Sequence, residues 1–455
     1  MPTGRRLLGL LVALGLLGLP AGILRASCAG RSCERPAGPG RVPFCGLPGA
    51  LRARIAAGYR EGRSPDVLVV TRSPAVAGAT DPLGGLAPAW PSVDPPPDPR
   101  VPLALSLDGR PPARVEPGAR LDAVAPTIAR LLGFRRPHPG VRSGEPMPTL
   151  RGGPRPRLVL LVAWKGVGTA DLLARPRAWP FLRTLVRGPG GTLGADVGSL
   201  PLDPAAVLTT IGTGGLPYQH GITGTLLRDD RGVLRRAFGP RAPLPVIATL
   251  AEDLDAALGE RPLVGLAAPD RADRGLIGGA WYLGHDRDLV RIGPDPAALA
   301  LRLLGHGFGA DDIPDVLAAV LSGPLRRMDA ATARLARAAR RRVGRGLLLV
   351  VTATGTSSPA GGSYRTSGPG SLGGAARPLR AEELVRDVER SLPAPDPVVE
   401  AAGVGGLFLD QDVLTRAGVT GGVAQEALLE VEGPDGAPLV ADAFQAFAVS
   451  FARYC

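Results

Sequence analysis

The sequence predicts an α/β fold with a mostly parallel central sheet that carries helices on both faces. The apolar runs RLVLLVAW (157–164), PLVGLAA (262–268), IPDVLAAVL (313–321) and GLLLVVTAT (346–354) have the length and unbroken hydrophobicity of strands buried on both sides. Segments with helical spacing, such as MDAATARLARAARRRV (328–343), alternate with these runs. This alternation is typical of parallel sheets, because a parallel neighbour can be reached only through a crossover connection.

Further elements flank these runs. ALRARIAAGYREG (50–62) has helical spacing, whereas DVLVVT (66–71) and VPLALSL (101–107) have the pattern of buried strands. RLDAVAPTIARLLGF (120–134) is expected to be a helix, which Asp122 can cap at its beginning. The remaining expected elements are the helix LRAEELVRDVERSL (379–392), a short strand at GLFLD (406–410) and a final segment, VADAFQAFAVSFARYC (440–455).

The composition is that of a folded domain. Of the 455 residues, 45% are hydrophobic and 21% are charged, which excludes a disordered chain and a wholly membrane-embedded one. The net charge of +12 could indicate an anionic partner. The arginines are scattered, however, without a dense run and without interleaved aromatic residues, so nucleic acid is not an expected partner.

The N-terminus has the pattern of an export signal. Arg5 and Arg6 precede LLGLLVALGLLGLPAGIL (7–24), an apolar stretch without charge. Residues 1–28 are therefore predicted to be a signal peptide or a membrane anchor, followed by a Gly/Pro/Arg connector over 29–42. The protein is expected at the extracytoplasmic face of the cell membrane, or secreted.

The four cysteines bear on whether this segment is cleaved. A Ser-x-Ala site ends at Ala29, and cleavage there would remove Cys28 and leave an odd number of cysteines. An intact anchor keeps Cys28, Cys33, Cys45 and Cys455, which can form two pairs outside the cytoplasm. We favour the uncleaved anchor.

Several stretches resemble the alkaline phosphatase superfamily, in particular its type I phosphodiesterase/nucleotide pyrophosphatase branch. AVLTTIGTGGLPYQHGITG (206–224) resembles the helix that follows the nucleophile, with Thr213-Gly214 and His220-Gly221 in the structural motif. LVLLVAWKGVG (158–168) resembles the first strand, which ends in Asp-Gly in active members. LLLVVTATGTSS (347–358) resembles a later strand that ends in Asp-His-Gly. The resemblance implies a mechanism with two metal ions and a Thr or Ser nucleophile.

The order of these stretches implies a circular permutation. Residues 43–150 resemble the C-terminal part of the family, and residues 157–455 its N-terminal and middle parts, within a single domain over 43–455. A permutation requires the original termini to lie close together. It therefore implies a disulfide between Cys45 and Cys455, which leaves Cys28 and Cys33 as a local pair.

The resemblance also implies that the catalytic residues are missing. Lys165, the only lysine of the chain, stands where the first strand should supply an Asp ligand. Ala353 and Thr354 stand at the Asp-His pair, and Pro204 stands at the nucleophile, nine residues before Thr213. None of the four histidines falls at a ligand position, and His220 matches a structural residue of the family. No metal and no cofactor are therefore expected.

Three interpretations of Lys165 remain open. Its ammonium could replace the missing metal charge and pair with a carboxylate such as Asp203. It could instead extend to solvent from the end of a strand. In the third interpretation, Lys165 and nearby amides bind an anion such as a phosphate ester. The candidate ligand-binding residues are Lys165, Asp203 and Thr354.

These observations lead to a hypothesis of a pseudoenzyme. The chain is expected to be an exported, membrane-anchored, alkaline-phosphatase-like protein with a binding or scaffolding role at the cell envelope. Its partners would be the membrane, through the N-terminal segment, and a phosphorylated small molecule or an envelope polymer. One alternative is an active phosphodiesterase or phosphatase that uses zinc or another divalent metal ion. Another is an unrelated exported α/β protein with chance matches.

Overall fold

The computed structural model describes residues 42–72, 76–77, 86–87, 89–93, 96–149, 155–279, 281–282, 287–356, 358–359, 379–392, 394–432, 438–450 and 455. Residues Val42–Cys455 form one compact unit. The expected signal peptide or anchor lies outside the described residues, as do Cys28 and Cys33, so the predictions about them stay predictions. Among the described helices, none combines the length and the apolar character needed to cross a membrane.

Strands and helices are interspersed along the whole of the described chain. The strands are β1 (Val67–Thr71), β2 (Val76–Ala77), β3 (Leu86–Ala87), β4 (Arg100–Leu107), β5 (Leu158–Trp164), β6 (Gly191–Asp196), β7 (Leu226–Arg228), β8 (Leu234–Arg236), β9 (Val264–Ala268), β10 (Leu289–Ile292), β11 (Asp315–Leu321), β12 (Leu347–Ala353), β13 (Ser358–Pro359), β14 (Leu379–Arg380), β15 (Val399–Gly403), β16 (Gly406–Leu409) and β17 (Val440–Gln445). The α-helices are α1 (Gly49–Gly58), α2 (Val124–Leu132), α3 (Thr169–Ala174), α4 (Pro180–Val186), α5 (Pro204–Thr213), α6 (Pro217–His220), α7 (Leu250–Ala257), α8 (Pro296–Leu304), α9 (Leu325–Val343), α10 (Ala381–Ser391), α11 (Gln411–Ala417), α12 (Gly421–Leu429) and α13 (Phe447–Ser450).

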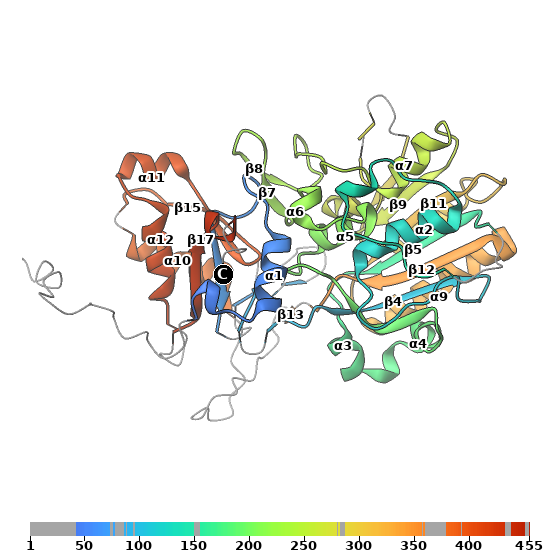
Figure 1. Cartoon of the computed structure of the whole chain (residues 1–455), viewed down its shortest axis with the longest axis horizontal. Coiled ribbons are helices and arrows are strands. Elements are labelled where there is room, and N and C mark those ends of the chain that lie inside the picture. The colour runs from blue at the N-terminus through green and yellow to red at the C-terminus, as the bar shows by residue number, and fades with distance from the viewer. Residues whose placement is uncertain are drawn as a thin grey trace, which may run out of the picture. The chain divides into compact units, whose positions relative to one another are not determined.

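The central sheet is mostly parallel, as predicted. Its order is β10-β9-β11-β5-β12-β4-β6, and the first five of these strands are parallel to one another (Figure 1). Only β4 runs against its neighbours β12 and β6. Every residue of β5, β11 and β12 is buried, which is why these strands appear in the sequence as unbroken apolar runs.

Helices cover both faces of this sheet. The chain passes from β10 through α8 to β11, and from β11 through α9 to β12, always in the same direction across the sheet. Because such crossovers are right-handed, α8 and α9 lie on one face. The chain returns from β6 to β9 in the opposite direction, so α5 and α7 lie on the other face (Figure 1).

A second sheet was not predicted. It has the order β15-β16-β1-β17, and all its pairs are antiparallel. The expected strand DVLVVT belongs to this sheet as β1. Val67 and Val69 face a core shared with α10 and α12, whereas Leu68 and Val70 face the main core. This alternation lets one strand join two apolar clusters, so β1 has no polar face that would distinguish it from a strand of the central sheet.

The expected cap of the helix over 120–134 is wrong. The α-helix α2 begins at Val124, and its N-cap residue Ala123 provides no side-chain cap. Asp122 lies in the preceding 3-10 turn and accepts hydrogen bonds from Arg120 and Ser143, the latter at 2.6 Å. A carboxylate bonded to a guanidinium is stabilised more than one bonded to a neutral amide, so this pairing prevails over capping.

The disulfide implied by the permutation is confirmed. Cys45 and Cys455 are bonded across a sequence separation of 410 residues. The bond joins the short helix Phe44–Gly46 to the last residue of the chain. The first and last described residues of the compact unit are thereby held close together.

Candidate functional site

The candidate site lies where the parallel strands of the central sheet end. Lys165 directly follows β5, and Thr354 directly follows the neighbouring strand β12. Asp270 and Asp273 come shortly after β9. The carboxyl ends of parallel strands meet at one edge of the sheet, which is where ligand sites form in α/β proteins.

Lys165 forms a buried ion pair. Its Nζ lies 3.0 Å from Oδ1 and 3.3 Å from Oδ2 of Asp273. The exposed fraction is 6% for the Lys165 side chain and 1% for that of Asp273. The interpretation that Lys165 extends to solvent is therefore wrong. The sequence did not single out Asp273 because it lies 108 residues further along the chain.

Two further aspartates, Asp203 and Asp270, interact electrostatically with Lys165. Burial raises the pKa of Asp203, against the hydrogen bonds from Thr225 and Ala205 and the charge of Lys165. Burial also acts to raise the pKa of Asp270, but the hydrogen bonds from Arg236 and Ala272 and the charges of Arg236 and Lys165 lower it below its ordinary value. Lys165 is therefore the cation of a cluster that includes Asp203, although its ion pair is formed with Asp273.

Neighbouring side chains close this edge of the sheet. Gly166 adopts a φ of 75°, which favours glycine, and its N–H donates to Thr354 Oγ1 at 2.8 Å. Leu202 lies against Gly355, where an added Cβ would come within 2.9 Å of Leu202 Cδ1. The buried residues at this edge also include Ala353, Pro204, Asp203 and Thr354. Leu202 thus occupies space beside the expected metal-binding positions.

The residues present do not fit a centre for zinc or another divalent metal ion. Among the described residues, no group of three or more His, Cys, Asp or Glu side chains comes together closely enough to hold a metal ion. Lys165 provides a permanent positive charge where the resemblance requires a carboxylate, and Ala353 provides only a methyl group. Zinc sites need at least three convergent nitrogen, sulfur or oxygen ligands.

The motif helix α5 and its continuation are fixed by internal hydrogen bonds. His220 is fully buried; its Nδ1 accepts a hydrogen bond from the Ile222 N–H at 3.1 Å, and its Nε2 lies 3.1 Å from Thr210 Oγ1. Since Nδ1 accepts, the proton of the neutral ring is on Nε2. Gly214 and Gly221 end α5 and α6 in the left-handed conformation. Through its contacts with Thr210 and Ile222, the His220 ring connects α5 to the turn after α6.

His220 should make the protein sensitive to acid. Burial lowers its pKa from 6.5 to about 3. Below about pH 6.5, His220 is therefore protonated in the unfolded chain but stays neutral in the folded protein. Protonation favours the unfolded chain, so the unfolding free energy decreases as the pH falls from 6.5 towards 3. Between about pH 6.5 and pH 4.5 this residue should remove about 2 kcal/mol of unfolding free energy.

The measurement is denaturant unfolding over this pH range for the wild type and for His220→Gln. The variant is less stable at neutral pH, but the difference between the two proteins should shrink as the pH falls. His306→Gln, at an exposed histidine, is the matched control. A constant difference between wild type and His220→Gln would contradict the prediction.

The end of α5 is held by a charge network that the sequence did not reveal. Asp253, fully buried, accepts hydrogen bonds from Arg136 Nε at 2.7 Å, Arg142 Nη2 at 3.1 Å and the Tyr282 hydroxyl at 2.8 Å. Both arginines also donate to the carbonyl oxygen of Thr213. In the sequence, the segment with these arginines has only the Pro/Arg/Gly composition of a loop, and this gave no signal for the network.

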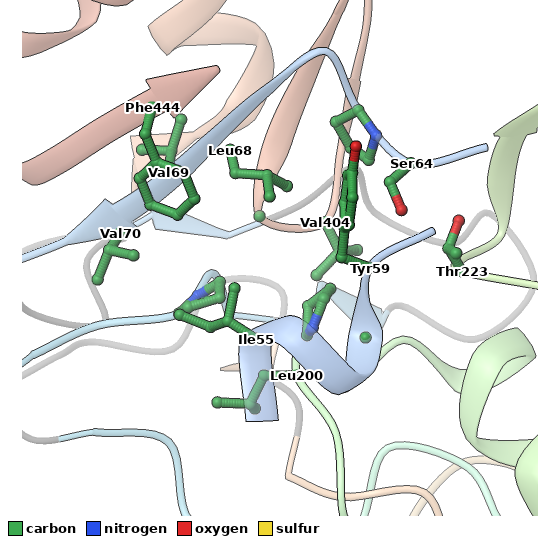
Figure 2. A pocket seen from close by; sticks show the side chains of 15 residues that line it. Ile55, Tyr59, Ser64, Leu68, Val69, Val70, Leu200, Thr223, Val404 and Phe444 are labelled. Carbon is green, nitrogen blue, oxygen red and sulfur yellow. The ribbon is translucent and has the colours of Figure 1, made fainter. Parts of the chain in front are cut away.

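A small cavity lies outside this site. It is lined mainly by apolar side chains of α1, β1 and the segments around them, including Ile55, Leu68 and Leu200 (Figure 2). Thr223 and Tyr59 also line it (Figure 2). Its volume is about 30 Å³, which is enough for a water molecule but not for an organic substrate.

The fold and site define a class: a mostly parallel α/β protein whose strand ends carry a closed lysine–aspartate cluster. No family model matches the chain, and neither does any curated protein. The chain is similar to the crystal structure of wild-type alkaline phosphatase PafA, with 14% identity and a TM-score of 0.41, over 61% of this chain and 77% of that chain. A multiply substituted PafA variant gives 13% identity and the same TM-score of 0.41 over the same shares, 61% and 77%. With a TM-score of 0.41 and 14% identity or less, this similarity does not indicate an activity of the chain.

Proposed function

We propose that this chain is an exported, alkaline-phosphatase-like protein without hydrolytic activity, which acts by binding or scaffolding at the cell envelope. The observation that carries the proposal is the buried ion pair between Lys165 and Asp273, at the strand end where the sequence resemblance requires a metal ligand. An ammonium in this place opposes cation binding by charge. It also occupies a carboxylate that could otherwise have served as a ligand.

The positions of the other substituted residues support the proposal. Thr354 lies beside Gly166, and Asp203, next to Pro204, feels the charge of Lys165. A chance match to the family would give no reason for these residues to gather at one edge of the sheet. The Cys45–Cys455 bond supports both the circular permutation, which needs neighbouring ends, and an oxidising location outside the cytoplasm.

The test combines metal analysis with an activity assay. The full-length protein is purified without chelators, its zinc and manganese are measured by mass spectrometry, and hydrolysis of bis-p-nitrophenyl phosphate is followed with each metal added. We expect substoichiometric metal and no turnover above buffer, because Lys165 puts a positive charge at one expected ligand position and Leu202 occupies space beside another. An active alkaline phosphatase prepared in the same buffers is the control. Stoichiometric metal together with turnover would show that the chain is a working hydrolase.

The single lysine allows a direct test of ligand binding. Lysine labelled with ¹⁵N at the side chain gives one protein ammonium signal, that of Lys165, because the chain has no other lysine. Titration with inorganic phosphate or p-nitrophenyl phosphate should leave this signal unchanged if the cluster only stabilises the fold. A saturable shift would identify Lys165 as an anion-binding residue and favour a phosphorylated ligand.

A further inference from the structure

Exposed arginines gather on one side of α9. This helix has 19 residues, and its core side includes Met328, Leu335 and Ala339. Six of its exposed arginines are Arg326, Arg327, Arg334, Arg337, Arg340 and Arg341, which we call the α9 arginine face. At 100° per residue they project within an arc of about 140°, and they extend over about 22 Å of helix. In the sequence the arginines look scattered, but α9 aligns these six.

No carboxylate of α9 neutralises this face. The only acidic residue of the helix, Asp329, is buried and accepts hydrogen bonds from the Phe181 and Leu182 amides. Within the described part of the chain, none of the six arginines forms an ion pair. Arg345, just beyond the helix, differs because it pairs with Asp108.

The elements beside α9 extend the positive charge. The helix packs against α8, α4 and the short helix Pro176–Ala178. Arg302 of α8 and Arg177 of the short helix are exposed. The acidic residues closest in sequence to Arg302 and Arg177 on the N-terminal side are Asp295 and Asp171. Their carboxylates accept hydrogen bonds from backbone amides at the N-termini of α8 and α3. The charge is thus spread across a helical layer.

We infer that the α9 arginine face docks on the anionic lipid headgroups of a bilayer. Several guanidinium groups on one side of a helix can contact phosphodiester groups that lie in a plane. The exposed side of α9 carries no large apolar side chain that could insert, so the contact is electrostatic adsorption. The helix also lacks aromatic residues, which single-stranded nucleic acid needs for stacking.

The N-terminal sequence supports this occupant. The apolar stretch 7–24 is predicted to enter a membrane, and residues 25–41 can extend over at most about 60 Å. A tether of this length keeps the domain beside the bilayer and makes docking an intramolecular event, so modest attraction is enough. The inference does not depend on the loss of hydrolytic activity.

Arginine modification in the full-length protein tests the inference. The chain is mixed with vesicles of phosphatidylcholine alone or with added phosphatidylglycerol, treated with phenylglyoxal, and analysed by peptide mass spectrometry. Modification of Arg326, Arg334 and Arg341 should slow roughly tenfold or more on the anionic vesicles, and high salt should reverse this protection. The predicted anchor is present in both samples, and an effect of its Arg5 and Arg6 on the amount of bound protein would not single out the arginines of α9. Arg130, Arg231 and Arg386, exposed elsewhere, are internal controls that should not change.

A charge variant makes the test independent of the labelling chemistry. Each arginine close to an anionic surface strengthens binding roughly fivefold. The full-length variant with Arg327→Gln, Arg334→Gln and Arg341→Gln should therefore lose roughly 100-fold in preference for anionic over neutral vesicles. The matched control carries the same substitutions at Arg130, Arg231 and Arg386, and should keep the preference.

Three outcomes would overturn the inference. The first is equal modification on both kinds of vesicle. The second is equal loss of preference in the variant and its control, which would show an effect of net charge alone. The third is protection by soluble polyphosphate or duplex DNA without protection by anionic vesicles, which would assign the face to a polymer and not to a membrane.

Discussion

Replacing Lys165 by Met should cost about 3–5 kcal/mol of unfolding free energy, because the substitution removes the ammonium that faces the buried, charged Asp273 carboxylate. Asp203 and Asp270 would also lose the favourable electrostatic interaction with Lys165. The measurement is urea or guanidinium unfolding at neutral pH, compared with the wild type.

The double variant Lys165→Met/Asp273→Leu separates the ion pair from the shape of the site. Removing both charges at once should restore most of the lost stability, since an apolar pair is often as stable as a buried ion pair. Arg114→Met is the control, because Arg114 and Glu116 form an ion pair with 64% exposure on both sides. Its cost should stay below about 1 kcal/mol. A loss of that small size at Lys165 would mean that the ammonium reaches water.

Replacing Asp253 by Ala should have a comparable effect, with a loss of about 3–5 kcal/mol or more. The side chains of Arg136 and Arg142 are 6% and 7% exposed, and Asp253 is the carboxylate that pairs with both. Burial already lowers the pKa of Arg136 to about 10, against the opposing charge of Asp253. Without the carboxylate, two buried guanidinium groups would repel each other at the end of α5. Denaturant unfolding measures the loss.

Two further variants sharpen this prediction. Asp253→Asn keeps the size of the side chain but removes its charge, so it should lose nearly as much stability as Asp253→Ala if charge is the cause. Asp230→Ala is the control, because Asp230 pairs with Arg63 while 87% of its own side chain is exposed. Its cost should be within about 1 kcal/mol. If Asp253→Asn were as stable as the wild type, packing alone would explain the role of Asp253.

The sequence predicted the central sheet well because burial on both faces leaves a local signal. The strands β5, β11 and β12 are unbroken apolar runs, and their expected positions agree with the structure to within two residues. The second sheet was missed because its strand β1 pairs with residues more than 300 positions away, such as Leu407 and Ala443. Pairing over such distances is not encoded in the composition of either segment.

The candidate site could be located from the sequence but not assembled. Lys165, Thr354 and Asp203 were identified from their places in motifs. In the structure, Thr354 accepts a hydrogen bond from Gly166, the residue after Lys165, and the charge of Lys165 acts on Asp203. The partner of Lys165 and the carboxylate between Arg136 and Arg142 could not be predicted. Asp273 lies 108 residues after Lys165, and Asp253 lies 117 residues after Arg136 and 111 residues after Arg142. Nothing in the local sequence distinguishes these two aspartates from the other acidic residues.

The sequence by itself determined the fold class and the single lysine at a strand end. The order of the stretches that resemble a known family implied the pairing of Cys45 with Cys455, which the structure contains. Each of these rests on local hydrophobicity, on the identity of a residue or on the order of motifs along the chain. The tertiary structure alone decided that Lys165 is buried against Asp273, that Leu202 covers Gly355 and that six arginines of α9 share one side. The physical reason is that burial, ion pairing and the surroundings of a charge depend on groups brought together from distant segments.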